Sequence, residues 1–97
     1  AGLILDPARH LLERDGKTIK VSAKEFALLE YLMRNHGKVM TRTQISEHVW
    51  DIDFDRGSNV IDVYIKSLRQ KVDKGFSKRL IHTVIGIGYV LREENER

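Results

Sequence analysis

Apolar residues recur at helical spacing along residues 58–74 of this 97-residue chain. At about 100° per residue they fall on one narrow stripe, which predicts the buried side of a helix. The stripe consists of Ile61, Ile65, Leu68 and Val72. The opposite side carries Asn59, Val63, Lys66, Ser67, Gln70 and Lys74. That side combines amides, a hydroxyl and cations around one apolar residue, which differs from an ordinary solvated face.

Each group on this polar side suits one part of a DNA duplex. Cations bind phosphates, amides and hydroxyls bond to base edges, and an apolar side chain contacts a thymine methyl group. A helix about 10–12 Å across also fits the major groove. The pattern therefore predicts a DNA-reading helix over residues 58–74.

Short strand patterns precede this helix at the N-terminus. They span Leu3–Asp6, His10–Arg14 and Lys17–Val21. Asp15-Gly16 lies between the last two and is the strongest short-range signal for a hairpin. Residues 1–21 are therefore predicted to form a small antiparallel sheet.

Two capping boxes predict the starts of two further helices. Ser22-Ala-Lys-Glu25 begins a helix that should end near His36, before Gly37. Its predicted core residues are Phe26, Leu28, Leu29, Leu32 and Met33. Thr41-Arg-Thr-Gln44 begins a shorter helix that ends near Trp50, with Ile45 and Val49 on its buried side. A brief strand is predicted at Val39-Met40.

A second hairpin is predicted at the C-terminus. Its strands are Leu80–Val84 and Tyr89–Arg92, joined by residues 85–88 with glycine where positive φ is expected. Tyr89 should pack this wing against the helices. The predicted fold class is α+β: a winged helix-turn-helix in a single domain over residues 1–97, with a three-helix core at 22–74 and a wing at 79–92.

Composition narrows the possible functions. The chain has no cysteine, so neither disulfides nor thiolate metal sites are available. It has no apolar run long enough to span a bilayer and no signal-peptide pattern, so we expect a cytoplasmic protein without membrane contact. Residues 47–62 carry a net charge of −4 and residues 64–82 a net charge of +5. Adjacent blocks of opposite sign predict two surfaces with different partners.

Catalytic and metal chemistry is not predicted. The four histidines, His10, His36, His48 and His82, show no ligand spacing on one face. Gly86-x-Gly88 is not a nucleotide loop, because Leu91 stands at the third glycine position and no helix follows. No nucleophile–base set stands out. We therefore expect neither an enzyme nor a cofactor.

Three motifs carry a resemblance to a known family. They are Thr41-Arg42-x-Gln44-Ile45-x-x-His48-Val49-Trp50, Ser58-Asn59-Val60-Ile61-Asp62-Val63-Tyr64-Ile65-Lys66-x-Leu68-Arg69-x-Lys71, and Ile81-x-Thr83-Val84-x-Gly86-x-Gly88-Tyr89. In order and spacing they resemble the OmpR/PhoB winged-helix effector domains, the C-terminal output domains of bacterial two-component response regulators. The resemblance covers nearly the whole chain.

The resemblance implies a four-stranded N-terminal sheet, a three-helix core and a wing. It also implies binding of promoter DNA on direct repeats, as a head-to-tail dimer built from domains that are monomeric alone. A receiver domain, addressed by a sensor kinase in a phosphorelay, would precede Ala1. The absence of an initial Met fits a C-terminal piece of a longer protein, although a recombinant fragment would begin in the same way. The acidic loop would contact RNA polymerase through Asp51, Ile52, Asp53, Phe54, Asp55, Arg56 and Gly57.

The resemblance also implies roles for single residues. Positions that contact bases or phosphates are Val60, Val63, Tyr64, Lys66, Ser67 and Gln70. Positions that contact the flanking backbone are Arg42, Trp50 and Thr83, and Gly86 of the wing is a further candidate. Two departures matter: many members insert an arginine into the minor groove where Ile85 stands, and several carry a guanine-binding arginine in place of Ser67. Specificity is therefore expected to depend on Lys66, Gln70, Val63 and DNA shape.

Several side chains keep a second interpretation. Arg69 could contact a phosphate or form an ion pair with Asp62 on the same flank of the helix. Lys66 and Gln70 could belong to a solvated face, with Lys66 paired to Asp62. Trp50 could pack against the core while its indole N–H bonds to a phosphate.

Two rival functions differ in class from a DNA-binding regulator. A winged helix used for protein–protein contact would need a continuous apolar patch along 58–74, where Val63 offers one, with Val60 and Tyr64 at its edges. A small hydrolase or nuclease has no support beyond polar residues present in any domain.

Overall fold

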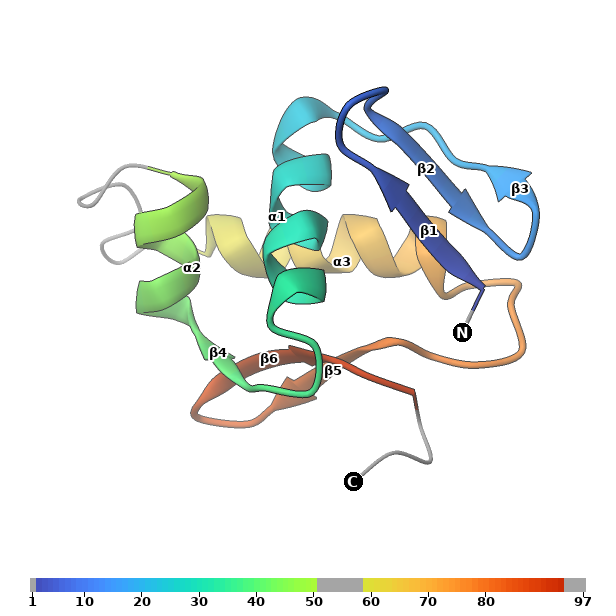
Figure 1. Ribbon diagram of the computed structural model, residues 1–97. Helices are drawn as coiled ribbons and strands as arrows, with labels where there is room; N and C mark the ends of the chain where they lie inside the picture. Colours follow the sequence, from blue (N-terminus) through green and yellow to red (C-terminus); the bar gives the residue numbers. More distant parts are fainter. Residues whose placement is uncertain (1, 51–58, 94–97) are drawn as a thin grey trace.

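The computed structural model describes residues 2–50 and 59–93 and contains two antiparallel sheets and three helices (Figure 1). In chain order the elements are β1 (Leu3–Asp6), β2 (Leu11–Arg14), β3 (Lys17–Thr18), α1 (Ala23–Arg34), β4 (Met40–Thr41), α2 (Arg42–Val49), α3 (Val60–Val72), β5 (Ile81–Val84) and β6 (Gly88–Leu91). The predicted α+β class is confirmed.

The N-terminal sheet has strand order β1-β2-β3. The turn between β2 and β3 contains Asp15 at φ 51° and Gly16 at φ 83°, the pair of positive angles that a type I′ hairpin turn requires. The four-stranded sheet that the resemblance implied is not what the described residues form, since this sheet has three strands. The third strand ends at Thr18, although the bond from the Ile19 N–H to the Leu12 carbonyl (2.8 Å) carries the pairing one residue further.

Both predicted capping boxes are present. At the start of α1 the Ser22 hydroxyl accepts from the Glu25 N–H (3.1 Å), and the Glu25 carboxylate accepts from the Ser22 N–H (2.8 Å). Thr41 and Gln44 make the same two bonds at the start of α2 (3.1 and 2.9 Å). Asn35 caps the end of α1, one residue before the predicted stop.

The second sheet joins the middle of the chain to the wing, in the order β4-β6-β5. Met40 lies opposite Tyr89 and Thr41 opposite Gly88. A side chain at Gly88 would clash with the Met40 carbonyl oxygen, since a Cβ there would lie 2.0 Å away. The brief strand predicted at Val39-Met40 therefore exists, one residue later, and its partner is the wing.

Helix α3 buries its apolar stripe in the core. Ile61, Ile65, Leu68 and Val72 are all fully buried, as predicted. They pack with Phe26, Leu28, Leu29 and Leu32 of α1 and with Ile45 of α2. Met33 was predicted to be core but is half-buried. The helix is shorter than predicted, because it begins after Asn59 and ends at Val72, so Lys74 lies beyond its end.

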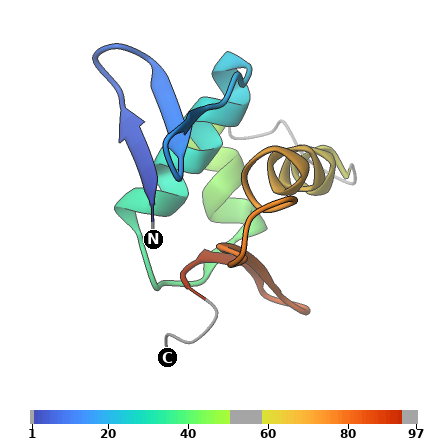
Figure 2. The ribbon, with the colours of Figure 1, turned by 90° about the vertical axis from the view of Figure 1, so that its right-hand side faces the viewer.

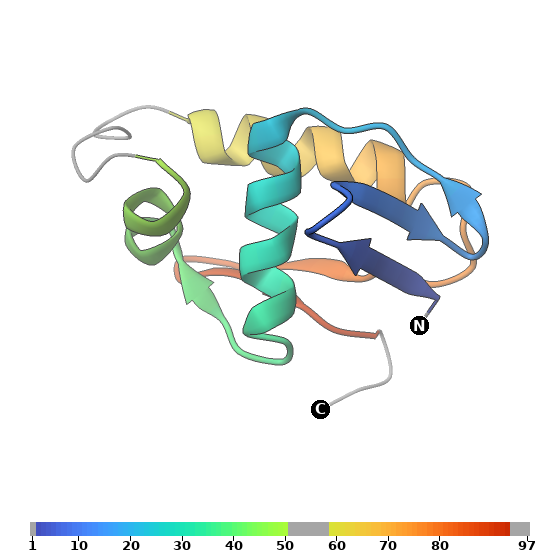
Figure 3. The same ribbon diagram turned by 45° about the horizontal axis from the view of Figure 1, so that its top comes forward.

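The three helices pack across one another between the two sheets. The N-terminal end of α1 meets the middle of α3, and β5 and β6 lie beside α3 on another side (Figures 2 and 3). Figure 1 shows α1 running across α3. This arrangement gives α3 two distinct flanks, one toward the start of α1 and one toward the wing.

A buried arginine ties the N-terminal sheet to the end of α3, and sequence patterns did not predict it. Arg14 donates to the carbonyls of Val72 and Lys78 and lies 3.4 Å from the Asp73 carboxylate. Asp73 also accepts from the backbone N–H groups of Leu80 (3.0 Å) and Ile81 (3.2 Å). The end of α3 and the start of β5 are thereby fixed to each other through one carboxylate.

Candidate nucleic-acid interface

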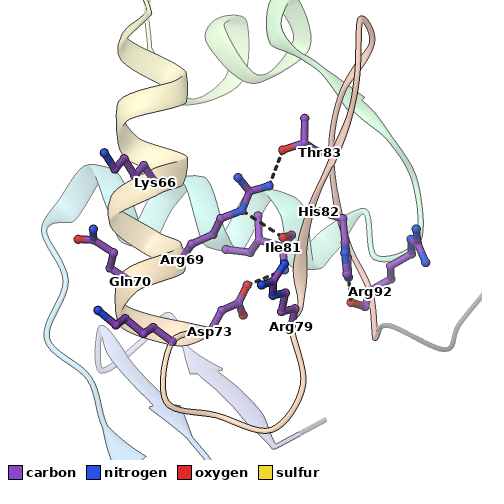
Figure 4. A pocket seen from close by; sticks show the side chains of 10 residues that line it. Lys66, Arg69, Gln70, Asp73, Arg79, Ile81, His82, Thr83 and Arg92 are labelled. Atoms are coloured by element: carbon purple, nitrogen blue, oxygen red, sulfur yellow. Dashed lines mark hydrogen bonds between the residues drawn. The ribbon is translucent and has the colours of Figure 1, made fainter.

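The exposed face of α3 centres on Val63, whose exposed fraction is 55%. Lys66 and Gln70 are also exposed, and Figure 4 shows both projecting from α3 away from Arg69 and the wing. Within residues 2–50 and 59–93, Lys66 forms no ion pair, so the proposed Asp62–Lys66 pair is not found there. Asn59 and Lys74, at the two ends of this face, are exposed as well.

On the flank toward the wing, Arg69 is held by neutral groups. Its Nε donates to the Ile81 carbonyl (3.2 Å) and its Nη2 donates to the Thr83 hydroxyl. Its guanidinium carbon lies 5.9 Å from the centre of the Tyr89 ring. These groups orient the guanidinium without cancelling its charge, because none of them is a carboxylate.

The alternative of an Asp62–Arg69 ion pair is wrong for the described residues, because Asp62 has other partners. Its carboxylate lies 3.4 Å from an Arg42 nitrogen and accepts a hydrogen bond from the Tyr89 hydroxyl. Burial and, after it, the hydrogen bond to Asp62 together raise the pKa of Tyr89 to about 12. Tyr89 is 7% exposed, which confirms the prediction that it packs the wing against the helices. Arg42 of α2 is thus paired with Asp62 of α3, and its phosphate contact stays a prediction.

On the flank toward α1, Ser67 and Lys71 are held by a carboxylate. Ser67 was predicted to lie on the exposed face, but it is half-buried and its hydroxyl donates to Glu25 Oε2. Lys71 Nζ donates to Glu25 Oε1 (2.7 Å). Burial raises the pKa of Glu25, but the hydrogen bonds from Lys71, Ser67 and the Ser22 N–H outweigh it and leave the pKa below its usual 4.5. Sequence patterns gave Glu25 a capping role and missed this link.

Trp50 and Tyr64 pack against each other at the N-terminal end of the interface. Their ring centres are 5.2 Å apart in an edge-to-face arrangement, and both residues are partly buried against the core, as is Val60. Lys24 Nζ lies 5.6 Å from the Trp50 ring. The packing interpretation of Trp50 is therefore confirmed, and its phosphate contact stays a prediction.

A cationic groove of about 670 Å³ runs between α3 and β5 (Figure 4). It is lined by Lys66, Arg69, Gln70, Asp73, Lys74, Arg79, Ile81, His82, Thr83 and Arg92. Five of these side chains are cationic and one is acidic, and the acidic one, Asp73, is bonded to backbone N–H groups. The groove therefore suits a polyanion, such as the backbone of a nucleic acid.

The tip of the wing is apolar. Ile85 is 91% exposed and Ile87 is 57% exposed. Between them Gly86 adopts φ +78°, and the Ile87 N–H bonds to the Val84 carbonyl (2.9 Å) and closes the turn. The prediction of positive φ in this turn is confirmed at Gly86. DNA contact by Gly86 stays a prediction.

Three further points concern RNA polymerase, metal ions and membranes. The acidic loop at 51–57, predicted to contact RNA polymerase, lies outside them. Over the described ranges, no group of three metal-ligating side chains occurs. No helix in that part of the chain is long and apolar enough to cross a membrane.

Comparison with known proteins points to one family. The family described as "Transcriptional regulatory protein, C terminal" matches residues 16–91. The transcriptional regulatory protein PcoR of Escherichia coli is 45% identical over 96 residues, which cover 99% of this chain and 42% of PcoR. The chain spans about two-fifths of the length of the curated relatives that it matches.

Two solved structures show the same fold. Response regulator DrrB, a Thermotoga maritima OmpR/PhoB homologue, superposes with a TM-score of 0.80 at 33% identity, over 94% of this chain and 42% of DrrB. The Klebsiella pneumoniae RstA DNA-binding domain, solved in complex with the RstA box, superposes with a TM-score of 0.84 at 26% identity, over 94% of this chain and 91% of that domain.

Proposed function

Since this chain belongs to the C-terminal family of transcriptional regulatory proteins, the winged-helix DNA-binding output domains of OmpR/PhoB-type response regulators, we propose that it inserts α3 into the major groove of promoter DNA. Val63, Lys66 and Gln70 would contact base edges: the valine a thymine methyl group, the lysine guanine, and the glutamine the two polar atoms of adenine. The exposure of Val63 at the centre of this face is the observation that supports the assignment. Lys66, on the same face, has no carboxylate partner among the described residues.

Phosphate contacts would flank this reading face. Arg69 is oriented toward the wing by neutral acceptors and keeps its charge, and Thr83 lies beside it. Lys74 adds a cation at the far end of the groove. Contacts of this kind position the helix and give binding its steep dependence on salt.

A single domain of this size makes few phosphate contacts, so it should bind weakly alone. We propose that two domains bind direct repeats about one helical turn apart, head to tail. In the whole protein a receiver domain would precede this chain and, once phosphorylated through its kinase, would dimerise and raise the local concentration of the second domain. The loop at 51–57 would contact RNA polymerase, and the protein would work in the cytoplasm, where promoter DNA lies.

A protein–protein module is the less favoured function. It would need a continuous apolar patch on the exposed side of α3, yet Val63 is surrounded there by Lys66 and Gln70. Val60 and Tyr64, its apolar neighbours, are partly buried against the core. The exposed surface therefore lacks the apolar area that such an interface requires.

The test is selection of bound duplexes from a random library, followed by binding of the selected sequence to the wild type and to Val63→Glu. A carboxylate against base edges should reduce specific affinity at least about a hundredfold. Ile4→Glu is the matched control, because Ile4 is also 55% exposed but lies on the N-terminal sheet. Failure to enrich any sequence, or equal binding by Val63→Glu, would refute the proposed reading face.

A further inference from the structure

We propose that Glu25 is a positioning residue that withholds Ser67 and Lys71 from DNA and so confines base reading to Val63, Lys66 and Gln70. This inference rests on the proposed function. Glu25 is buried, with an exposed fraction of 4%, although it is a carboxylate at the start of a helix. It lies at the third position of α1, where the capping box uses it, and α3 lies beside that end.

The carboxylate is shared between two helices. Its Oε1 accepts from the Ser22 N–H (2.8 Å) and from Lys71 Nζ (2.7 Å). Its Oε2 accepts from the Ser67 hydroxyl. Capping needs only the first of these bonds, so the other two serve to link α1 with α3. They fix two side chains that lie one turn apart on the recognition helix.

The link removes a donor from the reading face. Most base atoms in the major groove are acceptors: N7 and O6 of guanine, N7 of adenine and O4 of thymine. A hydroxyl whose proton is directed to Glu25 cannot donate to any of them. Ser67 is therefore inactive toward those base edges while Glu25 holds it.

The link also cancels a cation. A lysine contributes to DNA binding when it displaces counterions from phosphates. Lys71 is 2.7 Å from a buried carboxylate, and the lowered pKa of Glu25 means that this partner is ionised at neutral pH. Lys71 thus brings no net positive charge to the interface, in contrast to Lys66. Without Glu25 it would add affinity for any sequence, and the ratio of specific to non-specific binding would fall.

The experiment measures binding against salt concentration for two duplexes, the sequence selected by the wild-type domain and an unrelated one. Glu25→Gln keeps the capping box, because glutamine also serves there, but removes the charge. We expect the slope of log K against log salt to steepen by about one ion, and the specificity ratio to fall about threefold. Glu25→Gln combined with Lys71→Gln should restore the wild-type slope.

Glu30→Gln is the matched control. It removes the same charge from the same helix, where Glu30 forms an exposed pair with Arg34 (3.1 Å), and it should leave the slope unchanged. An effect of net charge alone would appear in Glu30→Gln as well, and an effect of folding would not be reversed by the second substitution.

Two results would overturn the inference: an unchanged slope in Glu25→Gln, or a steeper slope that persists in the double variant. Should Glu25→Gln fail to fold, Lys71→Gln alone decides, since a wild-type slope supports the inference and a slope lower by about one ion shows that Lys71 already contacts phosphate. If the wild type selects no sequence at all, the proposed function fails, and not the role of Glu25.

Discussion

The cationic side chains on the two flanks of α3 have partners of different charge. On the flank toward the wing, Arg69 is held by a carbonyl and a hydroxyl, which are neutral. On the flank toward α1, Lys71 is held by the carboxylate of Glu25. The two residues are two positions apart on one helix and both are fixed by hydrogen bonds. What separates them is the charge of the partner, which decides whether a positioned cation remains available to a phosphate.

This difference follows from what each neighbouring element can offer. A strand edge presents backbone carbonyls, and β5 supplies that of Ile81 to Arg69. The first turn of a helix favours acidic residues, because they satisfy free N–H groups and face the positive end of the helix dipole. Glu25 is there for that local reason, and packing α1 across α3 brings it to Lys71.

Among changes on the two flanks, replacing Arg69 should produce the largest effect. Arg69→Met keeps most of the stem but removes the charge, so we expect about a tenfold loss of affinity for all duplexes at moderate salt and a salt slope lower by about one ion. Titrations at several salt concentrations would measure both. Arg34→Met removes a cation from an exposed position on α1 and serves as the control. A loss confined to the selected sequence would mean that Arg69 reads a base.

Local features of this fold were predictable from sequence because their causes are local. The capping boxes, the apolar stripe of α3 and the turn at Asp15-Gly16 depend on residues within a few positions of one another. The strand patterns around Gly86 and Gly88 predicted the wing, and the three motifs identified the family. Gly88 was different: glycine is required there by the Met40 backbone across the sheet, and not by a positive φ angle.

The parts that were missed depend on residues far apart in the chain. A helical projection places Ser67 on the polar side, but it does not show that Glu25 reaches it from 42 positions away. The same projection suggested that Asp62 pairs within α3, whereas Arg42 and Tyr89 reach it from α2 and β6. Polar partners across elements are set by packing angles, which periodicity does not contain.

Removing the Tyr89 hydroxyl tests how firmly the wing flank is held. Tyr89→Phe leaves Asp62 without one donor, and we expect a loss of about 1 kcal/mol in the free energy of unfolding. Since the pKa of Tyr89 is raised to about 12 from 10.0, its contribution is complete below pH 10 and is lost as the pH rises toward 12. Denaturant unfolding at neutral and alkaline pH would measure this. Equal losses in both proteins above pH 10 would contradict the assignment.

Adding a cation at the wing tip should extend the charged flank. Ile85→Arg places a guanidinium on a residue that is 91% exposed, so stability should stay within about 0.5 kcal/mol of the wild type. We expect affinity to rise about threefold, with a preference for sites with a narrow, A·T-rich minor groove. Ile85→Gln is the neutral control. An increase in both variants would show that loss of the isoleucine, and not gain of charge, is responsible.

The smallest effect concerns the acid stability of the other flank. Burial raises the pKa of Glu25, and the pKa is lowered by the amount by which three hydrogen bonds and the charge of Lys71 exceed this effect. Because the folded pKa lies below the unfolded value of 4.5, the ionised carboxylate stabilises the fold above that pH, and this contribution is lost as the pH falls through the folded pKa. Unfolding free energies from neutral pH down to about pH 3 should therefore fall less steeply for Glu25→Gln than for the wild type. Identical slopes would mean that Glu25 is no better stabilised as an anion in the folded chain than in the unfolded one. The bonds from Lys71, Ser67 and the Ser22 N–H would then do no more than offset the cost of burying the carboxylate.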